Sequence, residues 1–440
     1  MTRRVFVANR GEIAVRVIDA SDRLGLETVL GVSVADRETL AARRAGRVIV
    51  LGGPRSADSY LRAETVVQAA VSTGCTVLHP GYGFLSEEPS FARLCADQGL
   101  TFVGPGPDAL ETLGDKLAAR RLAESVGVPV GPGGTAKSLD EVTAIADSIG
   151  YPVLVKAAHG GGGRGMNLAA DRTALLDAWG VASAEAEAAF GDGTVFLERY
   201  VRDAKHVEVQ VLADRHGHHV HLGERECSVQ LHYQKVVEEA PCSVLPEPTR
   251  ELLHDSALRV IEAIDYVGLA TVEFLYDVAA DRFSFLEVNP RVQVEHPVTE
   301  AISGVDLVRE QILVALGEPL SFEQSEVRLT GHAIEARITA SSPGVITRWR
   351  PPVRGSLRLD SHIYEGYSFP PLYDALMGKL MAWGRERDQA LELMAEALAD
   401  FQIEGIATSL DQLARVVDHP DFRNNTVTTH WLGDMVKEDS

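Results

Sequence analysis

The sequence has no long apolar segment and few cysteines. No apolar run reaches the roughly 18 residues that a membrane-spanning helix needs, and the start, MTRRVFVANRGE, becomes charged too early for a signal peptide. The four cysteines (Cys75, Cys95, Cys227 and Cys242) form no CxxC pair and are too sparse for a disulfide framework or a zinc site. We therefore expect a cytoplasmic protein with reduced, mostly buried thiols and no membrane contact.

Positive charge is also scarce. The 42 lysine and arginine residues face 63 aspartate and glutamate residues, which leaves a formal net charge of −21. Such an acidic surface argues against nucleic acid as the main partner. Any anionic substrate must then be held by local positive charge, and the individual candidates are Lys116, Lys156, Lys235, Arg291 and Arg337.

The chain of 440 residues, 45% of them hydrophobic, is long enough for about two to four domains. Residues 1–112 alternate short apolar runs with amphipathic helices, which is the pattern of an open α/β sheet. The expected strands cover 5–8, 28–34, 47–51, 76–79 and 100–103. Residues 9–12 join the first strand to its helix but lack the glycine spacing of a dinucleotide site.

A glycine-rich segment lies in the middle region. A capping box at 138–141 predicts a helix through Ile149, followed by a strand over 152–157, HGGGGRGM at 159–166 and more apolar residues. A Rossmann fingerprint or P-loop would open a helix, and GK[ST] is absent. The glycines thus predict a flexible turn between two strands that can lie over phosphates, with a mobile loop as the alternative.

Two further strands carry polar residues among apolar ones. In KHVEVQVLAD (205–214), His206, Glu208 and Gln210 share one face, which we expect to be solvated opposite an apolar core face. In TVEFL (271–275), Glu273 stands alone between apolar residues, where a carboxylate is seldom buried without a partner. A metal site and a surface salt bridge are the two competing explanations.

The densest polar cluster is FSFLEVNPRVQVEHPVTE, residues 283–300. Alternation in an extended strand places Phe285, Glu287 and Asn289 on one side. Glu and Asn oxygens suit Mg²⁺, which usually bridges substrate phosphates, and Glu273 would complete a two-carboxylate site. Four more polar residues follow the ladder-breaking Pro290: Arg291, Gln293, Glu295 and His296. A strand ending in a solvated charged turn is the plainer alternative.

A third region begins after about residue 325. HAIEARITA (332–340) alternates as a strand, so Glu335 and Arg337 are expected on the same side. A hairpin is expected around 361–373 and a helix over 390–398. The chain has no internal repeat, heptad array or low-complexity linker.

Taken together, the chain resembles biotin carboxylase, an ATP-grasp enzyme, over nearly its whole length. The resemblance is carried by VFVANRGEIAVRV, HPGYGFLSE, LGDK, VLVKAAHGGGGRGM, FLERY, KHVEVQVLAD, QKVVEEAP, TVEFL, EVNPRVQVEHPVTE and SHIYEGY. It implies an α/β fold, α+β overall. The implied parts are an N-terminal open parallel-sheet domain (1–112), an ATP-grasp domain (113–325) with a glycine-rich lid at about 130–203, and a C-terminal α+β domain (326–440).

The resemblance implies a two-step reaction, in which MgATP and bicarbonate give carboxyphosphate and ADP, and the carboxyl group then passes to a ureido nitrogen of carrier-bound biotin. The implied nucleotide contacts are Lys116, Lys156, Gly162, Gly163, Glu198, Arg199, Tyr200, Val201, His206, Gln230 and Tyr233. Within this set, Glu198–Val201 would follow the adenine along a strand edge. Glu273, Glu287 and Asn289 would bind Mg²⁺, with Mn²⁺ as an alternative ion.

The resemblance also implies the acceptor half of the site. The implied bicarbonate site consists of Lys235, Arg291 and the backbone of Val294, where a guanidinium can grip a planar anion through two hydrogen bonds. Glu295 would be the general base. Arg337 would stabilise the enolate-like ureido oxygen of biotin, and Tyr82 would line the same pocket.

Two departures from the family pattern concern ligand contacts. Leu231, His232 and Tyr233 stand where two basic residues and a histidine are usual, so one ATP-side contact is altered. The loop that starts at Ala340 is several residues shorter than usual and follows Arg337, on the biotin side. An acceptor nitrogen other than biotin, or a nucleotide-binding subunit without turnover, are therefore the rival functions.

No lysine lies in the alanine-methionine-lysine-methionine motif of the family's biotin attachment site. Any biotin must therefore come from another chain or from a lost segment, and the resemblance implies a separate biotin carboxyl carrier protein as the partner. A carboxyltransferase subunit would complete the pathway, as in acyl-CoA carboxylases. Homodimers are common in the family, but the sequence patterning determines no oligomeric state.

Overall fold

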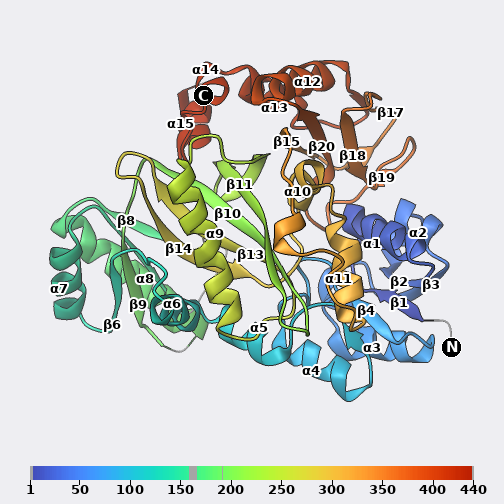
Figure 1. Cartoon of the computed structure of the whole chain (residues 1–440), viewed down its shortest axis with the longest axis horizontal. Coiled ribbons are helices and arrows are strands. Elements are labelled where there is room, and N and C mark those ends of the chain that lie inside the picture. The colour runs from blue at the N-terminus through green and yellow to red at the C-terminus, as the bar shows by residue number, and fades with distance from the viewer. Residues whose placement is uncertain (1–2, 158–165, 191, 439–440) are drawn as a thin grey trace.

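The computed structural model describes residues 3–157, 166–190 and 192–438, and its mixed α/β organisation confirms the expected fold class (Figure 1). The N-terminal sheet is parallel, with strand order β3-β2-β1-β4-β5. Its strands are β1 (Arg4–Val7), β2 (Glu27–Ser33), β3 (Arg47–Gly52), β4 (Val77–His79) and β5 (Thr101–Phe102). All five expected strands are therefore present, within a residue or two of the predicted bounds.

Helices cover both faces of the inner strands β1, β2 and β4, which are buried, whereas the edge strand β3 is largely exposed. The helices are α1 (Gly11–Arg23), α2 (Leu40–Arg44), α3 (Ala63–Ser72), α4 (Pro89–Asp97) and α5 (Pro107–Gly114). Val5 and Val7 pack in the core that contains the apolar face of α1, whereas Phe6 packs with residues of α3 and α4. A strand buried on both faces reads as a continuous apolar run, which is why these strands were predictable.

A second, four-stranded antiparallel sheet has the order β6-β9-β7-β8. It consists of β6 (Gly133–Ala136), β7 (Val153–Ala157), β8 (Asn167–Ala169) and β9 (Val195–Arg199), with α7 (Leu139–Ile149) and α8 (Arg172–Phe190). In Figure 1 this unit lies at the left end of the molecule, far from the N-terminal sheet. Strands β7 and β8 pair antiparallel, so the glycine-rich segment joins two strands as predicted. Residues 158–165, including Gly162 and Gly163, lie outside the described residues.

The start of α7 differs in detail from the predicted capping box. The Ser138 hydroxyl accepts a hydrogen bond from the Glu141 backbone N–H at 3.4 Å, as expected for an N-cap. The Glu141 carboxylate, however, accepts from the Lys137 N–H at 2.8 Å rather than from Ser138. The Glu141 carboxylate thus bonds the residue before Ser138, and the Ser138 hydroxyl still caps the first turn of α7.

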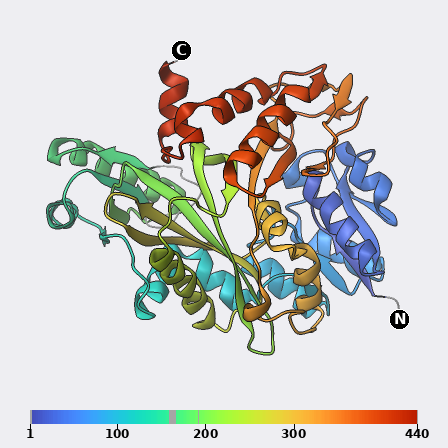
Figure 2. The same ribbon diagram turned by 45° about the horizontal axis from the view of Figure 1, so that its top comes forward.

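The third sheet has eight strands in the order β14-β13-β10-β11-β12-β15-β20-β18 and runs through the middle of the molecule (Figure 2). Its strands are β10 (Ala204–Ala213), β11 (His219–Leu231), β12 (Gln234–Ala240), β13 (Gly268–Asp277), β14 (Arg282–Asn289), β15 (His332–Thr339), β18 (Leu357–Ser361) and β20 (Leu376–Gly384). β12 pairs directly with β15, so the sheet is continuous across residue 325. The domain limits at 112 and 325 stay predictions, and the second falls between strands of one sheet.

Helices surround the eight-stranded sheet. They are α6 (Lys116–Ser125), α9 (Glu247–Glu262), α10 (His296–Ser303), α11 (Leu307–Ala315), α12 (Arg387–Asp400), α13 (Leu410–Asp418), α14 (Pro420–Arg423) and α15 (Trp431–Glu438). α12 contains the predicted helix 390–398. The four cysteines are free and buried, as expected. Within the described ranges, no helix combines the length and the apolar character needed to cross a bilayer.

Two sequence-based expectations about strands are wrong. The polar face of β10 is not solvated, because His206, Glu208 and Gln210 are all buried. They face other polar side chains inside the molecule, an arrangement that alternation alone does not distinguish from a wet face. Residues 361–373 form no hairpin, because β18 pairs with β20, while β19 (Ser368–Phe369) pairs with β16 (Gly344–Val345).

Asp214, at the turn between β10 and β11, supports a prediction about acid stability. Its buried carboxylate accepts backbone N–H groups from His216, His218 and Leu320 at 2.7 to 3.0 Å, and its Oδ2 lies 2.8 Å from the His218 ring. Burial by itself would raise the pKa of Asp214, but these hydrogen bonds lower it to about 2. The resulting stabilisation is fully present above the pKa of about 4 of an unfolded aspartate and is lost as pH falls toward 2.

We therefore expect Asp214→Asn to lower the free energy of unfolding by about 2 kcal/mol at pH 7. The difference from the wild type should shrink between about pH 4 and pH 2, as measured by urea unfolding across that range. Asp277→Asn is the matched control, because Asp277 is a turn aspartate that accepts one backbone hydrogen bond, from Ala280 at 3.1 Å. A pH-independent deficit in Asp214→Asn would contradict the assignment.

Candidate active site

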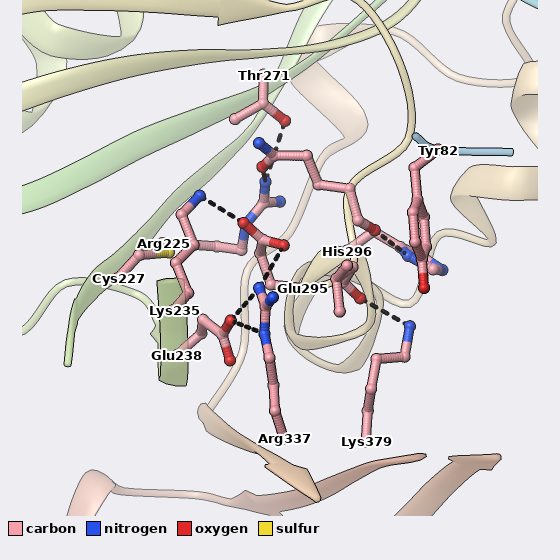
Figure 3. A network of polar contacts seen from close by, with 12 residues as sticks. Tyr82, Arg225, Cys227, Lys235, Glu238, Thr271, Glu295, His296, Arg337 and Lys379 are labelled. Carbon is pink, nitrogen blue, oxygen red and sulfur yellow. Dashed lines mark hydrogen bonds and ion pairs between the residues drawn. The ribbon is translucent and has the colours of Figure 1, made fainter. Parts of the chain in front are cut away.

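Lys235, Glu295 and Arg337, three of the predicted site residues, meet where the central strands approach the loop between β14 and α10 (Figure 3). Pro290 follows the last residue of β14 and ends the ladder. Glu295 occupies the N-cap position of α10, but its side chain makes no capping hydrogen bond. The carboxylate is thus free to point away from the helix, toward the strands β12 and β15.

A β-bulge in β14 changes the expected alternation. Glu287 pairs with Glu273, and Phe285 pairs with Phe274, so Leu286 is an extra residue between the two pairs. Phe285 is buried in the apolar core, so the prediction that it shares a face with Glu287 is wrong. The bulge changes the direction in which the side chains at the end of β14 point. Sequence periodicity does not reveal such a bulge.

The three expected Mg²⁺ ligands lie together on the paired strands β13 and β14. Glu273 and Glu287 are directly opposite each other, and the Asn289 amide donates to Glu273 Oε1 at 2.8 Å. Lys116, the first residue of α6, pairs with Glu287 at 2.9 Å. Burial would lower the pKa of Lys116, but Glu287 outweighs it and the pKa is raised. Two carboxylates and an amide oxygen suit a hard divalent cation.

Lys235 on β12 is the centre of a carboxylate cluster. Its ammonium lies 2.5 Å from Glu208, 3.0 Å from Glu273 and 2.5 Å from Glu295. Burial would lower the pKa of Lys235, but the three carboxylates hold it well above its ordinary value. The ammonium is therefore charged and ties the candidate metal ligands to the candidate base.

Two groups of described residues other than the predicted triad could offer metal ligands. Donor atoms lie within 4.8 Å of one another in the group His206, Glu208 and Glu273 and in the group Glu208, Cys227 and Glu295. Lys235 contacts the carboxylates of both groups. Its ammonium already supplies the positive charge that a metal would bring.

Glu295 bridges Lys235 and Arg337. Arg337 on β15 donates to Glu295 Oε2 at 2.9 Å and, through Nε, to Glu238 at 2.5 Å. Burial would raise the pKa of Glu295, but Lys235, Arg337 and Arg225 together lower it below its ordinary value. Glu295 is therefore an ionised carboxylate held between two cations, as Figure 3 shows.

The other two parts of the expected anion site lie next to this cluster. Arg291 contacts Glu87 and donates to Asn289 Oδ1 at 2.9 Å, so it lies beside the candidate metal ligands. The carbonyl of Val294 accepts a hydrogen bond from the fully buried Lys379 at 2.7 Å. This contact holds the loop that carries Glu295.

His206 and Gln230 form a buried pair next to the metal ligands. Gln230 Nε2 lies 2.8 Å from His206 Nδ1, and the other ring nitrogen lies 2.9 Å from Glu273. An amide donor at Nδ1 places the ring proton on Nε2, toward the carboxylate. In the four-stranded sheet, Lys156 on β7 pairs with Glu198 on β9 at 2.9 Å.

The expected adenine segment, Glu198–Val201, is only partly at a strand edge. β9 is paired on both sides, with β6 and β7, so the backbone of Glu198 is inside the sheet and that part of the prediction is wrong. The chain leaves the sheet at Tyr200, whose hydroxyl lies 2.7 Å from His430 Nε2. Arg199 is exposed, and Val201 follows beyond the strand.

The two departures from the family pattern occupy well-formed turns. His232 and Tyr233 form the β11–β12 turn with positive φ angles, and Tyr233 is 54% exposed. The short segment after Arg337 closes against the loop before α13, because Ser341 N–H donates to the Ala407 carbonyl at 2.8 Å.

Tyr82 donates to Glu12 Oε1 at 2.5 Å, and Glu12 Oε2 lies 3.2 Å from Lys379.

Sequence reasoning missed four residues that support the site. Glu208 was assigned to a solvated face, and no role was given to Arg225, Glu238 or Lys379. Arg225 is fully buried and hydrogen-bonds Glu208 at 2.6 Å. The signal available in the sequence was a charged residue inside an alternating strand. Alternation predicts which face of the strand a residue lies on, but it does not predict whether that face is buried.

Comparison with known proteins covers nearly the whole chain. Residues 1–110 match the family model "Biotin carboxylase, N-terminal domain", residues 115–323 match "Carbamoyl-phosphate synthase L chain, ATP binding domain", and residues 326–434 match "Biotin carboxylase C-terminal domain". Biotin carboxylase 1 of Bacillus subtilis is 43% identical over 442 residues, which cover 98% of each protein.

Two solved structures are also similar. The biotin carboxylase–β-γ-ATP complex from Campylobacter jejuni has a TM-score of 0.95 and 40% identity, with 98% of each chain covered. The biotin carboxylase domain of Hydrogenobacter thermophilus 2-oxoglutarate carboxylase, solved with MgADP and bicarbonate, has a TM-score of 0.94 and 39% identity, over 99% of this chain and 98% of that one. The sequence and the fold together show that this chain belongs to the biotin carboxylase family.

Proposed function

We propose that this protein is an ATP-dependent ligase that carboxylates biotin with bicarbonate. One observation carries the proposal: an ionised carboxylate, Glu295, is held by Lys235 and Arg337 next to the carboxylates Glu273 and Glu287. Such a cluster brings a candidate base, an anion site and a cation site into contact. Those are the groups that carboxyphosphate formation requires.

In the first step, bicarbonate attacks the γ-phosphorus of ATP and loses its proton, and the products are carboxyphosphate and ADP. Glu295 would accept that proton, since it is ionised and lies at the anion site. Lys235 and Arg291 would hold the anion and stabilise the charge that grows as the proton leaves. Glu273, Glu287 and Asn289 would bind Mg²⁺, which neutralises charge on the phosphates.

In the second step, the carboxyl group of carboxyphosphate passes to a ureido nitrogen of biotin, and the released phosphate takes up the proton that this nitrogen loses. Arg337 would face the ureido oxygen, where negative charge develops when the nitrogen is deprotonated. Lys116, Lys156 and His206 would contact the nucleotide. The finer assignments of Glu198–Val201, Gln230, Tyr233, Val294 and Tyr82 stay predictions, as does the role of Gly162 and Gly163.

We also propose that biotin reaches the site on a carrier protein and that a carboxyltransferase uses the product. These 440 residues contain no attachment motif, so biotin would come from another polypeptide or from a segment outside this sequence. The relatives belong to carboxylases of different final substrates, as 2-oxoglutarate carboxylase illustrates. The final carboxyl acceptor, homodimer formation and a cytoplasmic location stay predictions.

Release of ADP from ATP, Mg²⁺ and bicarbonate, measured with and without free biotin, tests the function. We expect turnover to require bicarbonate and to increase with biotin. Bicarbonate-dependent turnover without any response to biotin would favour a different nitrogen acceptor. Absence of turnover in all conditions would instead favour a nucleotide-binding subunit.

The metal assignment leads to a separate prediction about Glu287. Glu287→Gln removes one of two carboxylates from the cation site, so we expect the Mg²⁺ concentration for half-maximal nucleotide binding to rise by about tenfold or more. Calorimetric titration of ATP at several Mg²⁺ concentrations measures this effect independently of turnover. Glu251→Gln, at an exposed position of α9, is the control. An unchanged Mg²⁺ requirement would remove Glu287 from the metal site.

A further inference from the structure

Arg337 is held by a second carboxylate that the reaction scheme does not use. Glu238 on β12 contacts both Nε and Nη2 of Arg337, with Nε at 2.5 Å, and the same Nη2 also donates to Glu295 at 2.9 Å (Figure 3). Glu238 is fully buried, so its contact with Arg337 is shielded from water. The orientation of the guanidinium is therefore decided between Glu238 and Glu295.

Glu238 has a carboxylate neighbour directly across the sheet. In the pairing of β12 with β15, Glu238 is opposite Glu335, and both side chains are completely buried. Directly opposed residues on antiparallel strands have Cβ atoms about 5 Å apart, within reach of a hydrogen bond between two carboxyl groups. Like charges at such positions repel, and burial makes that repulsion costly.

The unpaired oxygens point to a proton between these groups. Among the described residues, Glu238 Oε2 and both oxygens of Glu335 have no hydrogen-bond partner, although all three atoms are buried. A buried carboxylate without a donor is strongly disfavoured. If Glu335 is a neutral acid, its O–H can donate to Glu238 Oε2, and Glu238 Oε1 remains free to accept from Arg337.

The charged groups around Glu238 and Glu335 are consistent with one proton being retained by this pair. The groups that face the pair are Lys235 on β12, Cys227 on β11, Arg337 on β15, Lys379 on β20 and Glu295 before α10. Burial raises the pKa of Glu335 well above its ordinary value, and Lys379 does not offset it. Burial likewise raises the pKa of Glu238 to about 7, although Arg337 opposes this.

We propose that Glu238 and Glu335 share one proton and together position Arg337 for biotin, an inference that rests on the proposed function. The protonated pair carries one negative charge and grips one side of the guanidinium. Nη2 is then shared between Glu238 and Glu295, and Nη1 is left for the ureido oxygen. Without this grip, Glu295 is the one remaining carboxylate partner of Arg337 named above, and the direction of Nη1 toward the acceptor is no longer fixed. Glu238 and Glu335 are thus positioning residues that act through Arg337.

Steady-state kinetics with varied free biotin and varied ATP test the positioning role. We expect Glu238→Gln to raise the KM for biotin about tenfold or more, because Arg337 loses a charge-assisted hydrogen bond, with the KM for ATP changed less than about twofold. Glu335→Leu should raise the KM for biotin in the same way. Glu335→Gln should restore it, because the glutamine N–H can donate to Glu238 as the neutral acid does.

Infrared spectroscopy tests the shared proton without reference to turnover. The wild type should show the carbonyl band of a protonated carboxylic acid at neutral pH, and Glu335→Leu should lack it. Glu310→Gln is the control, since Glu310 is a buried carboxylate on α11 that pairs with Arg309. Circular dichroism checks that each variant folds, and Glu335→Met and Glu238→Asp replace any variant that does not.

An unchanged KM for biotin in Glu238→Gln, no rescue by Glu335→Gln, or no protonated band in the wild type would each overturn the inference. A failure of the proposed function has a different signature. In that case the wild type itself shows no response to biotin, while the infrared band still reports on the shared proton. Equal changes in the KM for ATP and for biotin would indicate a general structural defect and would also refute the positioning role.

Discussion

Replacing Glu295 with glutamine is expected to lower bicarbonate-dependent ATP turnover by a factor of about 10² to 10⁴, the usual contribution of a general base. Glutamine keeps the size of the side chain but cannot accept the bicarbonate proton. The fold should tolerate the change, because Lys235 retains Glu208 and Glu273, and Arg337 retains Glu238. No buried cation is left without a carboxylate partner.

Measurement of ADP release at saturating ATP and bicarbonate checks this result. ATP binding in the presence of Mg²⁺ should remain close to that of the wild type, because Glu295 is not among the proposed metal ligands. Glu310→Gln serves as the control for the loss of a buried carboxylate elsewhere. Turnover within about tenfold of the wild type would show that another group accepts the proton.

The second large effect concerns stability. Arg225→Leu is expected to lower the free energy of unfolding by about 3 to 5 kcal/mol, the range for breaking a buried ion pair. The Arg225 guanidinium is fully buried and makes hydrogen bonds of 2.6 to 3.1 Å to Glu208, Gln210, Thr299, Thr271 and Gln293. Leucine would leave these polar groups buried with fewer partners.

Urea unfolding of the two proteins measures the difference. Arg225→Lys should recover part of the loss, because an ammonium restores the charge but cannot reproduce the planar fork of five donors. Arg354→Met is the surface control, since Arg354 pairs with Glu396 and Asp400 in partly exposed positions where ion pairs contribute little. If Arg225→Leu were as stable as the control, the network around Glu208 would not depend on this arginine.

The effect of Arg225→Leu should also extend to the site chemistry. Glu208 contacts both Arg225 and Lys235, and Gln293, which accepts from Arg225, also donates to Glu273 at 2.9 Å. The arginine therefore supports the position of residues on both the anion and the metal side. If Arg225→Leu lowers the free energy of unfolding and also weakens the binding of Mg²⁺ with the nucleotide, both effects would agree with this supporting role of Arg225.

The parts of the structure that were predictable depend on local patterns. The inner strands of the N-terminal sheet were found because parallel strands buried on both faces are continuous apolar runs, and the edge strand β3 has the same apolar run although it is largely exposed. Lys235, Glu273 and Glu295 were singled out because charged residues stand among strand-forming ones. The same rule was misleading for β10, since a polar face that is buried against other polar groups has the same alternation as a solvated face.

The sequence alone determined the family, the fold class and the residues that carry charge into the site, because motifs and periodicity are properties of neighbouring residues. Only the tertiary structure decided which charges meet. The bulge at Leu286 set the direction of Glu287, the pairing of β12 with β15 placed Glu238 opposite Glu335, and Lys379 reached Val294 from 85 residues away. Such contacts arise from strand register and sheet order, which local sequence patterns do not encode.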